Sequence, residues 1–118
     1  MKFSIESKQG HARAGSLSVN NKTINTPAFM TIGTYGSVKT MDTYDLKKCN
    51  VEIILSNAFH LMLRPGTDLI EKFGGLHQLM NWDGLILTDS GGYQVFSLGK
   101  DVKISNTGDE FRSRVKGD

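Results

Sequence analysis

Residues 85–96 read LILTDSGGYQVF, a short apolar run that stops at an aspartate and then passes through two glycines. Such a run is typical of a buried parallel strand, and the glycines allow the following loop to approach a ligand closely. In α/β barrels the catalytic residues lie at the ends of strands of this kind, which is where Asp89 stands. The same stretch would suit an aspartate that caps a turn, so the rest of the sequence is needed to choose between the two.

The start of the chain predicts a small antiparallel β-layer followed by a strand and a helix. Residues 3–7 and 14–19 alternate polar and apolar side chains, as half-exposed strands do, and residues 20–22 (Asn-Asn-Lys) are typical of a turn. Residues 27–33 are mostly apolar and end in glycine, which predicts a strand. The weak periodicity of residues 42–48 predicts the helix after it.

Two further strands follow in the same strand-helix order. Residues 51–56 form a short β-branched run with Asn57 at its exit, and residues 85–88 form the last apolar run. A short helical turn near residues 76–80 precedes that last run. The alternation of strands and helices predicts parallel pairing of the strands.

The clearest helix signal lies between these two strands. Pro65 can begin a helix without losing a hydrogen bond, and Gly74-Gly75 can end one. Leu69, Ile70 and Phe73 then share one face.

The end of the chain predicts a hairpin, and the whole predicts part of a barrel. Residues 102–105 and 110–115 alternate around residues 106–109 (Asn-Thr-Gly-Asp). Three parallel strands cannot close a barrel, which takes eight strands and about 250 residues. We therefore expect residues 1–118 to be a single partial α/β domain. It would form the first part of a TIM (β/α)8 barrel with an N-terminal antiparallel β-layer and a C-terminal β-hairpin.

Composition narrows the class of protein without naming a partner. The formal charge is +2 and the isoelectric point is near 8.7, and no block of lysines or arginines stands out, so charge neither predicts nor excludes RNA. A single cysteine, Cys49, excludes an internal disulfide and any zinc site made of several cysteines in this chain. We expect a reducing, cytoplasmic location. The short apolar runs predict no signal peptide and no membrane span.

A lone carboxylate at a strand end can act as a general acid or base, a nucleophile, a metal ligand or a reader of hydrogen-bond donors. Tyr93 follows closely enough to stack on something flat bound beside Asp89, as aromatic rings do with splayed nucleobases. A guanine-type base offers adjacent N–H donors, and each charge-assisted bond contributes about 1.5 to 3 kcal/mol. Alternatively, Tyr93 is a packing residue. Spacing alone leaves both open.

Other candidate chemistries are weaker. Asp-Ser-Gly-Gly also occurs around the nucleophile of trypsin-like proteases, but those are all-β, usually carry disulfides and need a histidine and an aspartate around the serine. His60 lies between two apolar residues and reads as a packing residue, and His11 and His77 have no ligand at metal spacing. We predict no metal site in this chain. Asn57, at the end of the neighbouring strand, could aim its amide at Asp89.

Four motifs occur together in order and resemble those of the tRNA-guanine transglycosylases, also called queuine tRNA-ribosyltransferases. The match runs over nearly the whole chain. The motifs are Thr26–Met30, Gly33–Lys39, Ser56–Leu61 with Leu63–Gly66, and Thr88–Leu98.

The resemblance implies an irregular eight-stranded α/β barrel with an added subdomain that holds a structural zinc. Such an enzyme exchanges guanine at the tRNA wobble position for a 7-deazaguanine in queuosine biosynthesis, by a double displacement in which another aspartate attacks the ribose. The residue matching Asp89 accepts and donates the proton and binds the base. The base-binding loop falls on Asp89, Ser90, Gly91, Gly92 and the stacking Tyr93, and Asn57 matches a pocket asparagine.

The resemblance also bears on the base and the partners. The variant Gly-Gly-Tyr-Gln at residues 91–94 is similar to bacterial and eukaryotic members, and Ile32 stands where bacterial members carry a branched apolar residue. This favours the bacterial type, which incorporates 7-aminomethyl-7-deazaguanine. The implied partners are tRNA, the free base, the remainder of the barrel and a second copy in a homodimer, with no membrane.

The chain departs from the family in length, because the attacking aspartate, the zinc ligands and most of the basic tRNA surface belong to motifs that it lacks. We therefore expect a pentosyltransferase in the full-length parent and no activity in residues 1–118 alone. The alternatives are a non-catalytic accessory subunit and a short tRNA- or base-binding module. Retention of Asp89 and Tyr93 argues against the accessory subunit.

Overall fold

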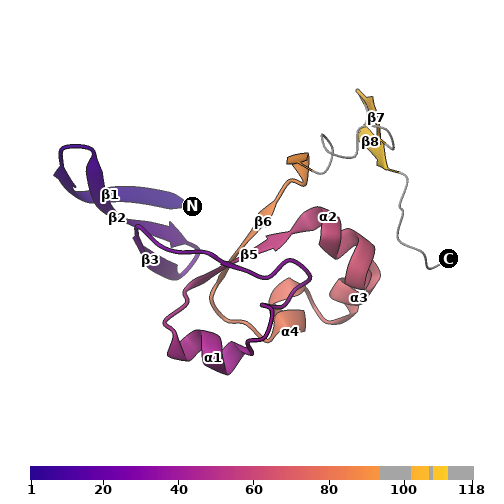
Figure 1. Cartoon of the computed structure of the whole chain (residues 1–118), viewed down its shortest axis with the longest axis horizontal. Coiled ribbons are helices and arrows are strands. Elements are labelled where there is room, and N and C mark those ends of the chain that lie inside the picture. The colour runs from indigo at the N-terminus through magenta and orange to yellow at the C-terminus, as the bar shows by residue number, and fades with distance from the viewer. Residues whose placement is uncertain (94–101, 107, 112–118) are drawn as a thin grey trace.

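The structure is a computed structural model that describes residues 1–93, 102–106 and 108–111. It contains an antiparallel sheet of three strands, a parallel sheet of three strands with helices, and a two-stranded hairpin (Figure 1). This confirms the mixed α/β class. The described residues contain three parallel strands, so the eight-stranded barrel stays a prediction. None of the described helices is long and apolar enough to cross a bilayer.

The N-terminal sheet consists of β1 (Lys2–Gln9), β2 (Ala12–Val19) and β3 (Lys22–Thr26), in that order. The expected β-layer is confirmed, and β3 is an additional strand that the sequence analysis did not predict. Asn20 takes a left-handed conformation with φ of 52°, which lets Val19 pair directly with Lys22 across a two-residue turn. The asparagine pair therefore makes a tight hairpin turn.

The parallel sheet consists of β4 (Thr31–Ile32), β5 (Ile53–Asn57) and β6 (Leu85–Asp89), with β5 in the middle. The predicted parallel pairing is confirmed.

The strand predicted at residues 27–33 is wrong in its first half, since β4 holds only two residues. In the register that pairs Thr31 with Ile54, residues 27–29 would face residues 50–52. Asn50 has a left-handed backbone conformation, with φ of 54°, because it lies directly after the C-cap of α1 (Thr43–Lys48) and is not part of a strand. The earlier residues therefore have no strand to pair with.

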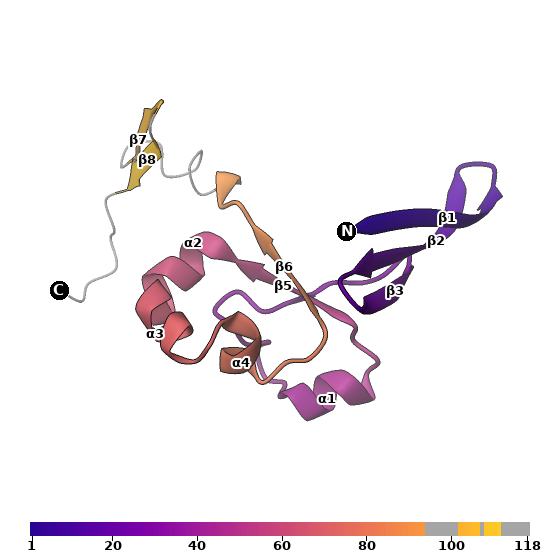
Figure 2. The ribbon, with the colours of Figure 1, turned by 180° about the vertical axis from the view of Figure 1, so that it is seen from behind.

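Helices α1 (Thr43–Lys48) and α4 (Leu76–Met80) cover one face of the parallel sheet (Figures 1 and 2). Both were predicted, and α1 begins one residue later than expected because Asp42 caps it, accepting a bond from the backbone of Asp45 at 2.8 Å. The core between these helices and the sheet is made by Leu46, Ile54, Met80 and Trp82.

The helix predicted to begin at Pro65 begins later, as α3 (Thr67–Lys72). The short α2 (Ala58–Leu61) comes first, and a kinked turn, η1 (Met62–Gly66), separates the two. Arg64 is extended inside that turn and Gly66 has φ of 97°, so a regular helix can start only after Gly66.

Two of the three apolar side chains that share one face of this helix lie at the surface. Leu69 and Phe73 are exposed, and α3 has no buried residue. The expected stop at Gly74 and Gly75 is confirmed, since both adopt positive φ angles, 84° and 110°.

The C-terminal hairpin is confirmed, with β7 (Val102–Ser105) antiparallel to β8 (Gly108–Phe111). The second strand starts two residues earlier than predicted, and positions 112–115 of that prediction lie outside the described residues, as does the motif segment 94–98.

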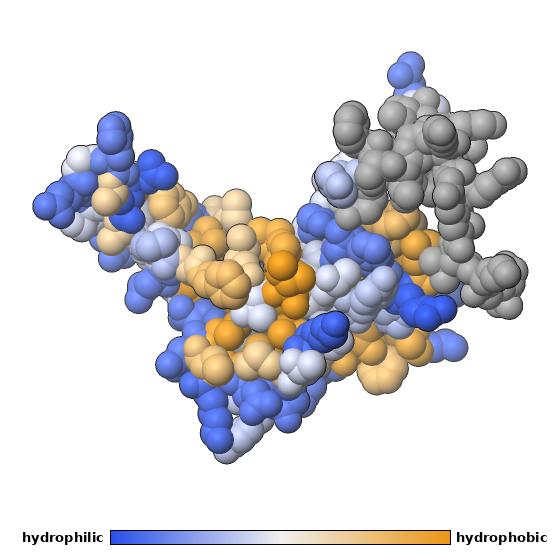
Figure 3. All heavy atoms as spheres, in the orientation of Figure 1, coloured by the Kyte–Doolittle hydropathy of each residue, from blue (hydrophilic) through white to orange (hydrophobic). Residues whose placement is uncertain are grey.

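One face of the parallel sheet carries no helix among the residues that the structure describes. Along this face the N-terminal sheet covers the amino ends of the strands, where Ile24 packs on Ile53 and Leu85. The next residues on the same face, Ile32 and Leu87, keep 61% and 40% of their surface exposed. Figure 3 shows apolar surface gathered between the N-terminal sheet and the helices. We call the face of the parallel sheet that carries Ile32, Leu55 and Leu87 the bare face. The N-terminal sheet covers it at the amino ends of the strands, and it is exposed towards their carboxyl ends.

Candidate functional site at the carboxyl ends of the strands

Asp89 and Asn57 end neighbouring parallel strands and are register partners. Side chains alternate along a strand, so both residues lie on the same face as Leu55 and Leu87, two positions before them. The pair therefore stands at the open end of the bare face. This is the edge of a parallel sheet at which α/β enzymes bind and transform their ligands.

The carboxylate of Asp89 is held by three hydrogen bonds. Its Oδ2 accepts from Asn57 Nδ2 at 2.7 Å, and its Oδ1 accepts from the backbone nitrogens of Ala58 at 3.2 Å and Gly91 at 3.3 Å. The side chain is half-buried. The expected contact between Asn57 and Asp89 is present. The carboxylate is thereby oriented, while its remaining lone pairs can accept bonds from a ligand.

Asn57 has a second partner that the sequence analysis missed. Its Oδ1 accepts a bond from the backbone nitrogen of His60 at 3.0 Å and so caps α2. With the amide oxygen used in this way, the amide nitrogen is turned towards Asp89. The signal was available, because asparagine before a helical turn is a preferred N-cap.

The glycine loop begins with the chain bending back on Asp89. Gly91 has φ of 70°, a conformation that favours glycine, and it is in this conformation that its nitrogen reaches the carboxylate. The ring of Tyr93 is 76% exposed. This exposure favours a ring that is available for stacking over one that packs in the core, and Ser90, Gly91 and Gly92 connect it to Asp89.

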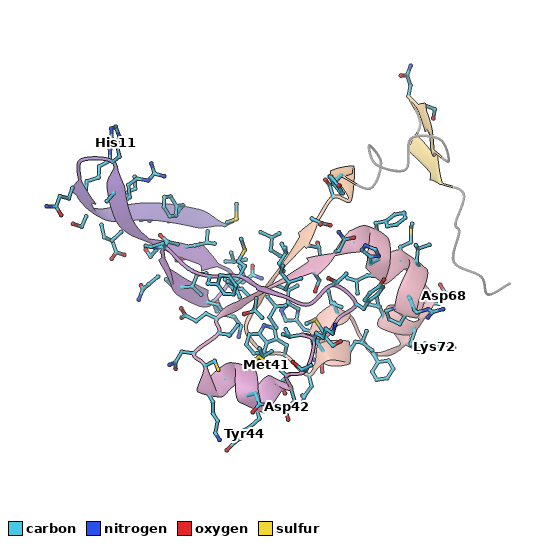
Figure 4. The ribbon with its side chains drawn as sticks, viewed as in Figure 1. His11, Met41, Asp42, Tyr44, Asp68 and Lys72 are labelled. Carbon is cyan, nitrogen blue, oxygen red and sulfur yellow. The ribbon has the colours of Figure 1, made fainter. Side chains whose placement is uncertain are left out.

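His60 and His77 make contacts within the fold. The ring of His60 makes edge contacts with Tyr35 and Phe59, with centroids 5.2 and 5.5 Å apart, as expected of a packing residue. His77 Nε2 lies 3.1 Å from the carbonyl oxygen of Gly84. His11 lies at the tip of the β1–β2 hairpin (Figure 4). In the described part of the chain, no three His, Cys, Asp or Glu side chains gather as metal ligands would.

A hollow of about 420 Å³ lies at the opposite ends of β5 and β6 and contains a charged cluster. Lys47 Nζ lies 3.0 Å from Asp83 Oδ1, and this hydrogen bond lowers the pKa of the Asp83 carboxyl below its usual range. Lys22 Nζ donates to the backbone carbonyl of Asp83. Lys47 and Asp83 neutralise one another at the surface, where both side chains are exposed. The oriented carboxylate of Asp89 is therefore the stronger candidate for a functional group.

Comparison with known proteins identifies relatives along the whole chain. Residues 7–118 match the family model described as queuine tRNA-ribosyltransferase. Proteins of that name from Herminiimonas arsenicoxydans, Nitrosospira multiformis and Aliivibrio salmonicida are 54%, 56% and 54% identical to it over all 118 residues. In each case the match covers 32% of the relative. The chain therefore spans about a third of the length of the curated relatives it matches.

Proposed function

Because this chain belongs to the queuine tRNA-ribosyltransferase family, we propose that it is the base-recognition part of a tRNA-guanine transglycosylase. The full-length protein would exchange guanine at the tRNA wobble position for a 7-deazaguanine in queuosine biosynthesis. The observation that carries the proposal is the Asp89 carboxylate, oriented by Asn57, Ala58 and Gly91 at the open end of the bare face.

Asp89 would serve as the proton acceptor and donor of the exchange. When an aspartate from the rest of the protein attacks the ribose, the bond to guanine breaks and the leaving base takes up a proton. When the incoming base attacks in turn, it gives up a proton and the ribose bond to that aspartate breaks. For this, Asp89 would enter the first step as the carboxylic acid and give its proton to the leaving guanine. The carboxylate that results would take the proton of the incoming base in the second step, so the group returns to its starting state.

Recognition of the base would use the same group and its loop. The N–H donors of a guanine-type base can bond to the lone pairs of Asp89 that the protein donors leave free, and Tyr93 would stack on the base from the loop formed with Ser90, Gly91 and Gly92. Ile32 lies on the bare face with 61% of its surface exposed, where it can contact a substituent on the base. We propose 7-aminomethyl-7-deazaguanine as the incoming base.

The remaining parts of the proposal concern the full-length protein. It would act on tRNA in the cytoplasm as a homodimer, with the rest of the barrel closing over the bare face. The structural zinc of the family does not fit the residues described here, since they show no group of three ligands. We therefore derive no step through it.

Exchange of radiolabelled guanine into tRNA by the full-length protein containing residues 1–118 tests this function. Asp89→Ala and Asp89→Asn should abolish exchange while tRNA binding, measured by filter retention, persists. Asp68→Asn removes an exposed carboxylate on α3 and serves as the matched control with wild-type exchange (Figure 4). Wild-type exchange rates in both Asp89 variants would refute the assignment.

The alternative function is a short tRNA- or base-binding module. The two proposals differ in what the 118-residue chain does by itself. A module would bind tRNA or guanine alone, whereas a part of the enzyme would need the remaining two thirds. Sequencing the gene beyond codon 118 separates them: continuing family sequence supports the enzyme, and a stop codon supports the module.

A further inference from the structure

Ser56 is the buried polar side chain of the described core, with 0% of its surface exposed. A hydroxyl costs free energy in such a place unless it makes a hydrogen bond. Its Oγ donates to the carbonyl oxygen of Gly33 at 2.8 Å, and the sulfur of Met80 lies 4.0 Å away. The hydroxyl therefore has one well-defined target, the residue that follows β4.

Strand β4 is held by few bonds. It pairs with β5 through two register positions, and among the described strands β5 is its one neighbour. The nitrogen of Gly33 adds a bond to the carbonyl of Leu55 at 2.7 Å, and the carbonyl of Gly33 also closes a turn with the nitrogen of Gly36 at 3.1 Å. The Ser56 bond is one more link between the strands, formed at the step next to Asn57.

The position of β4 matters because of the face on which its last side chain lies. Ile32, Leu55 and Leu87 are in register across the three strands. Asp89 lies two positions beyond Leu87, so Ile32 and Asp89 are on the same face with β5 between them. Ser56 is on the opposite face, among the helices. A ligand bound to Asp89 would meet Ile32 across the width of β5.

We propose that Ser56 is a positioning residue that fixes the end of β4, and with it Ile32, relative to Asp89. It thereby makes the site selective for the size of the substituent on the bound base. This inference rests on the proposed function, which supplies the base as ligand. Without the hydroxyl, the end of β4 is held less firmly and Ile32 can move with respect to the carboxylate.

The test is the ratio of kcat/KM for guanine to kcat/KM for 7-aminomethyl-7-deazaguanine in the full-length protein containing residues 1–118. Ser56→Ala and Ser56→Cys should change this ratio by up to about tenfold, because the free energy of the one lost hydrogen bond limits how strongly it can bias the position of Ile32. Ser56→Thr keeps a hydroxyl and should keep the wild-type ratio. Ser18→Ala removes a hydroxyl bonded to Thr23 at 2.8 Å in the N-terminal sheet and should leave the ratio unchanged.

The outcomes separate this inference from the function on which it rests. An unchanged ratio in Ser56→Ala and Ser56→Cys, with exchange still measurable, overturns the role of Ser56 and leaves the proposed function standing. An equal fall of both kcat/KM values also overturns it, since that is the mark of a purely structural residue. Absence of exchange in the wild-type protein overturns both. Ser56→Cys fills the position with a slightly larger thiol, which is a weak hydrogen-bond donor, and keeps the test decisive if Ser56→Ala does not fold.

Discussion

The side-chain nitrogen of Asn57 lies 2.7 Å from Oδ2 of Asp89, while the side-chain oxygen of the same asparagine caps α2. One amide thus links the start of a helix to the orientation of a carboxylate on the next strand. Mutation can separate these two roles. The cap of α2 needs a hydrogen-bond acceptor at position 57, whereas Asp89 needs a donor on a side chain long enough to contact it.

Asn57→Ala should lower the free energy of unfolding by about 0.5 to 2 kcal/mol through loss of the cap, and should slow base exchange as well. Asn57→Ser should retain most of the stability, because serine also caps helices, yet should slow exchange because its short side chain no longer reaches Asp89. Thermal unfolding and guanine exchange on the full-length protein measure the two effects. Equal exchange rates in Asn57→Ser and wild type would show that the amide does not serve Asp89.

Tyr93→Ala should raise KM for the base, because the exposed ring is expected to stack on it, and such stacking contributes about 1 to 3 kcal/mol per base. Tyr93→Phe keeps the ring and should resemble wild type. Tyr44→Ala, an exposed tyrosine on α1, is the matched control (Figure 4). Steady-state kinetics with varied base concentration measure the change, and a wild-type KM in Tyr93→Ala would contradict stacking.

Gly84→Ala should destabilise the fold, since a Cβ at this position would overlap the indole of buried Trp82, with Nε1 at 2.7 Å. Overpacking of this kind typically costs about 1 to 3 kcal/mol. Gly10→Ala meets no atom within 4 Å but carries φ of 59°, so it isolates backbone strain from overlap. Denaturant unfolding of both variants should give the larger loss for Gly84→Ala. The reverse order would show that Trp82 moves aside without cost.

Asp83→Asn should make the melting temperature of the protein less sensitive to a fall in pH. The hydrogen bond from Lys47 lowers the pKa of Asp83 in the folded protein below its unfolded value of about 3.9. The ion pair therefore stabilises the fold above pH 4 and loses this effect as pH falls through the folded pKa. The melting temperature should fall less between pH 7 and pH 3 in Asp83→Asn than in wild type. High salt should reduce the difference because both side chains are exposed.

The parallel strands and the contact at their carboxyl ends were predictable from sequence. Apolar runs that stop at polar residues fix where strands end, and parallel strands that end together bring Asn57 and Asp89 into register. That prediction needed only periodicity and the alternation of elements.

The kinked connection after β5 was not predictable in the same way. Pro65 suits a helix start, but the positive φ of Gly66 and the extended Arg64 delay the start to Thr67. Leu69 and Phe73 share a helical face, and a periodic pattern cannot say whether anything packs on it. Ser56 belongs to one of the four motifs, but its buried bond to Gly33 joins residues 23 positions apart, and such a bond produces no periodic pattern in the sequence.

The bare face has a consequence for anyone who purifies residues 1–118 alone. Ile32 and Leu87 border a strip of apolar surface beside the outer edges of β4 and β6, which pair with no further strand among the described residues. Water disfavours the apolar strip, and a strand edge can pair with the edge of a second copy. Copies of the isolated polypeptide are therefore expected to associate, and light scattering should rise steeply with concentration.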